Sequence, residues 1–194
     1  PDSAGFAIYK NSEKKEYKYS LCINNLDFSK FKKDILKKIN NLKLNQYSDH
    51  VIVKTTEIPK KFIKFINNEF PEVSIVGYGH SIEIFKQVGN PKDVVKKFKL
   101  DSFSGTHGIG HTRMATESAI TTDGSHPYST GKDECLVHNG SLSNHNNLRR
   151  ELVKKGNIFN SENDTEVAAG YVSNSLLNKK SLKDTLVSGL KDLD

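Results

Sequence analysis

GHTRMAT at residues 110–116 is the first of three polar motifs that organise this sequence of 194 residues, and HNGSL at 138–142 and NDTEV at 163–167 follow it. Each motif joins a turn of small residues to a polar side chain beside an apolar segment. They supply the guanidinium of Arg113, the amide of Asn139 next to Gly140, and the carboxylate of Asp164. One cation, one amide beside a glycine and one anion suit a small zwitterion that carries an amide.

The periodicity of the apolar residues around these motifs predicts an α+β fold in layers. Ser29 is the expected cap of the first helix, and Asp164 is expected to cap the last one with its own carboxylate. The first two strands are expected to form a hairpin, and Gly77-Tyr78-Gly79 a turn. Strands are predicted at 3–9, 17–23, 50–55, 73–76, 81–88, 105–115 and 134–137, and helices at 28–42, 59–70, 91–100, 144–155 and 164–177.

The composition is that of an ordered polar domain, with 35% hydrophobic and 27% charged residues. The net charge is +6, but aromatic residues do not interleave the basic ones, so scattered surface lysines explain it better than a nucleic-acid site. No apolar run approaches the ~18 residues of a membrane helix. Cys22 and Cys135 form neither a disulfide framework nor a zinc motif, which favours a reducing, cytoplasmic location.

Each candidate site residue also has a purely structural interpretation. Arg113 is suited to grip a carboxylate with both guanidinium nitrogens, or to form a structural salt bridge. The pair Asn139-Gly140 is typical of a tight turn, but it also has the donors of an oxyanion hole. Asp164 suits a helix cap or an ammonium partner. His107 and His111 share a strand face too far apart to chelate well, so we predict no metal site.

The occurrence of these motifs together, in this order, is a more specific signal of a family than any one motif alone. DSAG at residues 2–5, GHTRMAT, HNG and NDTEV resemble the class II glutamine amidotransferases, which are N-terminal-nucleophile hydrolases. The runs TESA, GSHP and NGSLSNHN resemble a subgroup, the separate glutaminase subunits of glutamate synthase-like and N-methylglutamate synthase enzymes. The resemblance covers residues 1–9 and about 105–190.

The resemblance implies a glutamine site. Arg113 would hold the α-carboxylate of glutamine with Thr116 nearby, Asp164 would hold the α-ammonium, and Asn139 and Gly140 would form the oxyanion hole. The family commonly has Trp at the position of Met114 and often His at that of Glu117. These two departures fall on the wall of the implied pocket.

The implied nucleophile is an N-terminal cysteine upstream of the DSAG motif, with its own α-amino group as the base. The sequence contains no such residue, and Cys22 and Cys135 match core thiols instead. It begins without Met and stops within a helix-like run. We therefore expect one amidotransferase domain over residues 1–194, cut at both ends, with the nucleophile upstream of Pro1.

The implied fold is a four-layer αββα sandwich with an α+β insertion over residues 10–104. The implied reaction is hydrolysis of glutamine to glutamate and ammonia, which passes to a synthase partner in a hetero-oligomer. No cofactor is expected in this chain; FMN, if the complex has one, would be in the partner. The rival interpretations are a non-catalytic glutamine-binding regulatory or scaffold subunit, and an amidohydrolase that acts on another amide.

Overall fold

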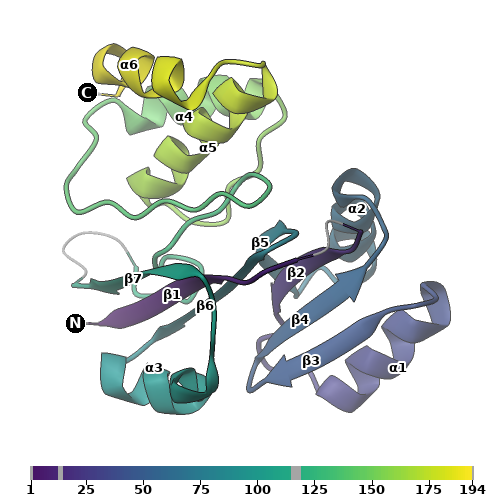
Figure 1. Cartoon of the computed structure of the whole chain (residues 1–194). Helices are drawn as coiled ribbons and strands as arrows, with labels where there is room; N and C mark the ends of the chain where they lie inside the picture. The colour runs from purple at the N-terminus through teal and green to yellow at the C-terminus, as the bar shows by residue number, and fades with distance from the viewer. Residues whose placement is uncertain (1, 13–14, 115–118, 194) are drawn as a thin grey trace.

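The computed structural model describes residues 2–12, 15–114 and 119–193. The described residues form seven strands and six α-helices, an α+β arrangement as predicted (Figure 1). In chain order these are β1 (Ser3–Tyr9), β2 (Tyr17–Cys22), α1 (Phe28–Lys38), β3 (Lys43–Tyr47), β4 (His50–Thr55), α2 (Pro59–Glu69), β5 (Ser74–Gly79), β6 (Ile82–Val88), α3 (Pro91–Phe98), β7 (His107–Arg113), α4 (His145–Lys154), α5 (Asp164–Leu177) and α6 (Leu182–Asp192).

The strands form two antiparallel sheets, and the predicted hairpin of the first two strands is wrong. Sheet A has the order β6-β1-β7, and sheet B has the order β3-β4-β2-β5. β1 has the small residues that a covered central strand needs: a Cβ added at Gly5 would lie 2.2 Å from the carbonyl oxygen of His126. The large alternating side chains of β2, such as Tyr19 and Leu21, pack instead with α1 and α2.

Clusters of buried side chains hold these layers together. Sheet B packs on α1 and α2 through Phe31, Ile35 and Phe62. Sheet A packs on α3 through Phe85 and Phe98. The helices α4, α5 and α6 gather on the other side of sheet A from α3 (Figure 1), and α5 makes contacts with both of the other two. A membrane-spanning helix is absent from the described part of the chain.

Local differences from the predicted elements have simple physical causes. Asp27, not Ser29, caps α1, because its carboxylate accepts a hydrogen bond from the Lys30 N–H at 2.8 Å. The helix ends at Lys38, and the chain then forms β3, a polar edge strand that has no apolar alternation to reveal it. Gly77-Tyr78-Gly79 lies within β5 and is not a turn.

The segment at residues 134–137 is not the buried strand that was predicted. It makes one isolated bridge, in which Leu136 and Tyr128 exchange two backbone hydrogen bonds of 2.8 and 3.0 Å. Its residues are half-buried. Two long loops flank α4 in the chain: residues 119–144 precede it and residues 155–163 follow it. Both loops lie between the sheets and the helices (Figure 1).

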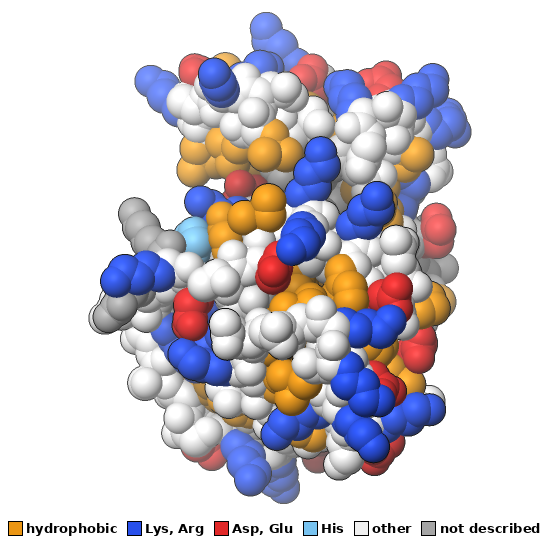
Figure 2. Space-filling model, turned by 90° about the vertical axis from the view of Figure 1, so that its right-hand side faces the viewer, with side chains coloured by type: hydrophobic (Ala, Val, Ile, Leu, Met, Phe, Trp, Pro, Cys, Tyr) orange, Lys and Arg blue, Asp and Glu red, His pale blue; other side chains and the backbone are white. Residues whose placement is uncertain are grey.

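A groove of about 490 Å³ runs between the two sheets and the helical layer. Its walls include Ile63 of α2, Tyr78 of β5, Ile158 and Leu177 at the end of α5. Figure 2 shows this side of the molecule, with a narrowing below the helices at the top and hydrophobic side chains exposed within it. The helical layer thus meets the sheets along a partly open seam.

Candidate functional site

Arg113 is the last residue of β7, and its side chain is buried at 8% exposure. β7 runs antiparallel to β1, so that Arg113 lies opposite Ser3. The N–H of Asp2 donates to the carbonyl of Arg113 at 2.7 Å. The guanidinium therefore stands at the edge of sheet A where β1 begins.

Asp164 is the first residue of α5, but it is not the cap that the sequence predicted. The cap is Asn163, whose side-chain oxygen accepts the Thr165 N–H at 2.9 Å. The Asp164 carboxylate accepts the backbone N–H of Leu142 at 2.8 Å. Asp164 thus ties the HNGSL loop to the start of α5 and retains acceptor capacity on its other oxygen, because a carboxylate has about four lone-pair sites.

Two histidines lie close to these charged groups. The rings of His111 and His126 are 4.2 Å apart, and His126 Nε2 lies 3.0 Å from the Thr165 hydroxyl. The loop that carries His126 is held by Lys86, whose ammonium donates to the carbonyls of Asp123 and Ser125 at 3.0 and 2.9 Å. This buried lysine gives the loop a fixed position above sheet A.

The electrostatics of the histidine pair show that the predicted charges converge on it. Burial, together with the nearby His111, Lys86 and Arg113, lowers the pKa of His126 to about 3, while the negative Asp164 opposes the shift. Burial, Arg113 and His138 lower the pKa of His111. At neutral pH His126 is therefore uncharged, with a cation and an anion close enough to act on it.

Asn139 and Gly140 lie in an exposed loop directly after His138. His138 is close enough to His111 to lower its pKa, which places the loop beside the histidine pair. A Cβ at Gly140 would lie 2.7 Å from His138 Nε2, so the glycine packs closely under that ring, and a larger residue would displace it. The next anchor of the loop is Leu142, which is bound to Asp164. Thr116 lies outside the described residues.

The structure thus brings Arg113, Asp164 and the Asn139-Gly140 loop to one end of sheet A. The roles assigned to them remain predictions. Sequence reasoning gave no role to His126 or to Lys86. The GSHP run contains the histidine, but no pattern shows that a lysine on β6 fixes its loop.

Neither cysteine belongs to this group. Cys135 Sγ accepts from the Tyr9 hydroxyl at 3.4 Å, at the end of β1 opposite to Ser3. Cys22 is buried in the core at 1% exposure. Burial raises the pKa of both thiols, to about 11 for Cys22, so neither is a thiolate nucleophile at neutral pH.

Part of the chain matches a known domain family. Residues 101–175 match the model of a glutamine amidotransferase domain. This range includes all of the site residues named above except those of the first strand and Lys86. The whole chain is 46% identical to a glutamine amidotransferase-like protein, GlxB, of Rhizobium meliloti, and 32% identical to a putative glutamine amidotransferase of Methanothermobacter thermautotrophicus.

The chain spans 65% and 68% of the length of those two relatives. It also matches, at 36% identity over 105 residues, a glutamine–fructose-6-phosphate aminotransferase of Methanococcus maripaludis, of which it covers 18%. In that match 54% of the chain is aligned. The likeness over the whole chain and the domain match together show that the chain belongs to the glutamine amidotransferase family.

Proposed function

We propose that this chain is the glutamine-binding part of a class II glutaminase, which hydrolyses glutamine to glutamate and ammonia. The observation that carries the proposal is that Arg113 and Asp164 both act on the buried His126, whose ring packs on the partly buried His111. A cation and an anion near one small site match the α-carboxylate and α-ammonium of an amino acid. The proposal rests on this geometry and on the family.

In the proposed complex, the Arg113 guanidinium binds the α-carboxylate with two parallel hydrogen bonds. The Asp164 carboxylate accepts from the α-ammonium while it still accepts from Leu142. His126 is neutral, so it adds no second cation beside the ammonium. The side-chain amide of glutamine then extends toward the loop of Asn139 and Gly140.

The Asn139 amide and the Gly140 N–H are proposed to stabilise the oxyanion that forms when the amide is attacked. Their loop is held by the same Asp164 that would bind the ammonium. Substrate binding and the position of the oxyanion hole are therefore connected through one carboxylate. Donors fixed in advance stabilise the transition state most strongly.

We place the nucleophilic thiol N-terminal to Pro1, as the family resemblance implies. Its sulfur would attack the amide carbon, ammonia would leave with the proton carried by the α-amino group, and water would hydrolyse the thioester to glutamate. The beginning of β1 lies beside Arg113. A preceding segment therefore has a short path to the proposed site.

Further features of the proposal follow the family rather than the geometry. They are the four-layer αββα arrangement, an insertion at residues 10–104, the cytoplasmic location, the passage of ammonia to a synthase partner in a hetero-oligomer, and FMN, if used, in that partner. Thr116 would assist Arg113. No cofactor is proposed for this chain.

The second candidate function is a regulatory or scaffold subunit that binds glutamine without hydrolysing it. The position of Cys22 and Cys135 away from the site favours it. Mass spectrometry of the mature N-terminus distinguishes the two functions, because the glutaminase requires a terminal cysteine. The full-length protein should release ammonia from glutamine and much less from asparagine; binding without release would support the regulatory subunit.

A further inference from the structure

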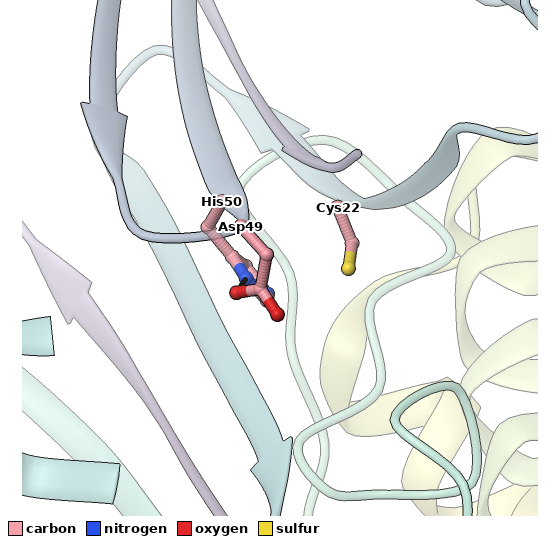
Figure 3. Close-up of side chains that lie close together, drawn as sticks. All are labelled: Cys22, Asp49 and His50. Atoms are coloured by element: carbon pink, nitrogen blue, oxygen red, sulfur yellow. Dashed lines mark hydrogen bonds and ion pairs between the residues drawn. The ribbon is translucent and has the colours of Figure 1, made fainter. Parts of the chain in front are cut away.

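Three side chains that can bind a metal meet at one corner of sheet B, outside the proposed glutamine site. Cys22 ends β2, His50 begins β4, and Asp49 lies in the turn between β3 and β4. Cys22 and His50 are directly opposite each other on neighbouring antiparallel strands, so their side chains share a face. Figure 3 shows all three side chains extending to the same side of these strands.

The ligand atoms of this group are close together and shielded from water. One thiol sulfur, one carboxylate oxygen and one ring nitrogen lie within 4.8 Å of one another. Cys22 is 1% and His50 0% exposed, and the Asp49 side chain is 22% exposed. The backbone is fixed as well, because the Ile23 N–H donates to the Asp49 carbonyl at 2.9 Å.

His50 is prepared to act as a ligand. Its Nδ1 lies 3.0 Å from an Asp49 oxygen, which orients the ring. Its Nε2 is buried and has no hydrogen-bond partner among the residues that the structure describes.

We propose that Cys22, Asp49 and His50 form a site for a divalent transition metal of the zinc type. A thiolate, an imidazole and a carboxylate are the ligands that zinc takes, whereas magnesium and calcium select oxygen. Zinc bonds are about 2.0–2.3 Å long, so atoms that lie within 4.8 Å of one another are close to the spacing of ligands around one ion. The thiol proton of Cys22 is released on binding.

The side-chain oxygen of Asn24 is a candidate for the fourth ligand. It lies 3.3 Å from the Cys22 sulfur, on the backbone that leaves β2. Otherwise water completes a four-coordinate site, as it does at zinc sites with three protein ligands. In either case the ion would join the end of β2 to the turn that enters β4.

The ammonium of Lys97, on α3, competes with a metal ion for the Asp49 carboxylate. This ammonium lies 2.7 Å from the Asp49 carboxylate and 2.8 Å from the side-chain oxygen of Gln87. It neutralises one of the proposed ligands and would repel an incoming cation. The proposal therefore predicts that Lys97→Met binds the metal more tightly than the natural chain does.

The test is a titration of the full metal-free protein with Co²⁺ alone, followed by absorbance, and then with Zn²⁺ alone. One equivalent of Co²⁺ should produce the near-ultraviolet band of a cobalt–thiolate bond, and Zn²⁺ should remove it. Cys22→Ser should abolish the band. Asp49→Asn, at the most exposed of the three ligands, should weaken binding at least about tenfold.

Cys135→Ser is the matched control, because it removes a thiol that lies outside the group, and it should keep the full band. Circular dichroism of each metal-free variant checks that it folds. Absence of the band in the folded natural chain would overturn the proposal. So would a band that survives Cys22→Ser, or Co²⁺ affinity that is equal with and without Lys97.

Discussion

The carboxylate of Asp164 is assigned two tasks, and one substitution separates them. Asp164→Asn keeps an oxygen that accepts the Leu142 N–H but removes the negative charge that would bind the α-ammonium. The loss of one partner of a buried charge pair costs about 2 kcal/mol or more, so the Kd for glutamine should rise roughly 30-fold. Titration calorimetry measures it, and Asp184→Asn, at the start of α6, is the matched control.

Asn139→Ala tests the oxyanion hole. The side chain is exposed in its loop, so its removal should leave the stability of the fold nearly unchanged. Loss of one donor to the oxyanion should lower kcat of the full-length enzyme by about 10²–10³, with a small change in KM. Steady-state ammonia release measures both constants, and an unchanged kcat would exclude the assigned role.

The neutral state of His126 makes a pH-dependent contribution to stability. Its pKa is about 3 in the folded protein and about 6.5 in the unfolded chain, so the unfolded state binds one more proton between these values. Stability from this residue is complete above pH 6.5 and is lost as the pH falls toward 3, by up to about 1.4 kcal/mol per pH unit.

His126→Gln should therefore reduce that slope. Urea denaturation of the natural chain and the variant at several values between pH 4 and 7 gives the comparison. The variant is expected to be less stable at pH 7, where it loses the bond to Thr165, and to lose less stability on acidification. If the stability of the natural chain and that of the variant fell by the same amount with pH, the His126 ring would not be held neutral in the folded protein.

At the scale of the elements, sequence patterns predicted most helices and strands but not their partners. Helical spacing of apolar residues located α1, α2, α3 and α4, alternation located β1 and β2, and a run of β-branched residues located β4. The pattern of β1 does not show that it pairs with β6 and β7, because strand pairing depends on contacts far apart in the chain. β3 was not predicted, because it is a polar edge strand without the alternation of apolar and polar residues that indicates a strand.

The start of α5 shows a limit of the same kind. Asn163 and Asp164 are both good capping residues, and sequence alone does not decide between them. Asn163→Ala should cost about 1 kcal/mol of unfolding free energy, because it removes the acceptor for the Thr165 N–H. Denaturant unfolding measures this loss. A larger effect on stability from Asp164→Asn than from Asn163→Ala would reverse the two roles.

At the scale of the whole molecule, the candidate site lies where the helical layer meets one end of sheet A (Figure 1). β7 supplies Arg113, the loop over β1 supplies His126, and α5 supplies Asp164. The three motifs that carry most of these residues were visible in the sequence. Their convergence was not, because it depends on Lys86, on the small residues of β1, and on the bond between Asp164 and Leu142.

The most direct test of the central claim is the binding of glutamine by the full-length protein with Lys in place of Arg113. Arg113→Lys keeps the charge but removes the paired donors that fit a carboxylate. We expect at least about a tenfold rise in the Kd for glutamine by calorimetry, while Arg150→Lys, on the exposed face of α4, leaves it unchanged. If Arg113→Lys binds glutamine as tightly as the natural chain, Arg113 does not hold the substrate and the assignment of the site is wrong.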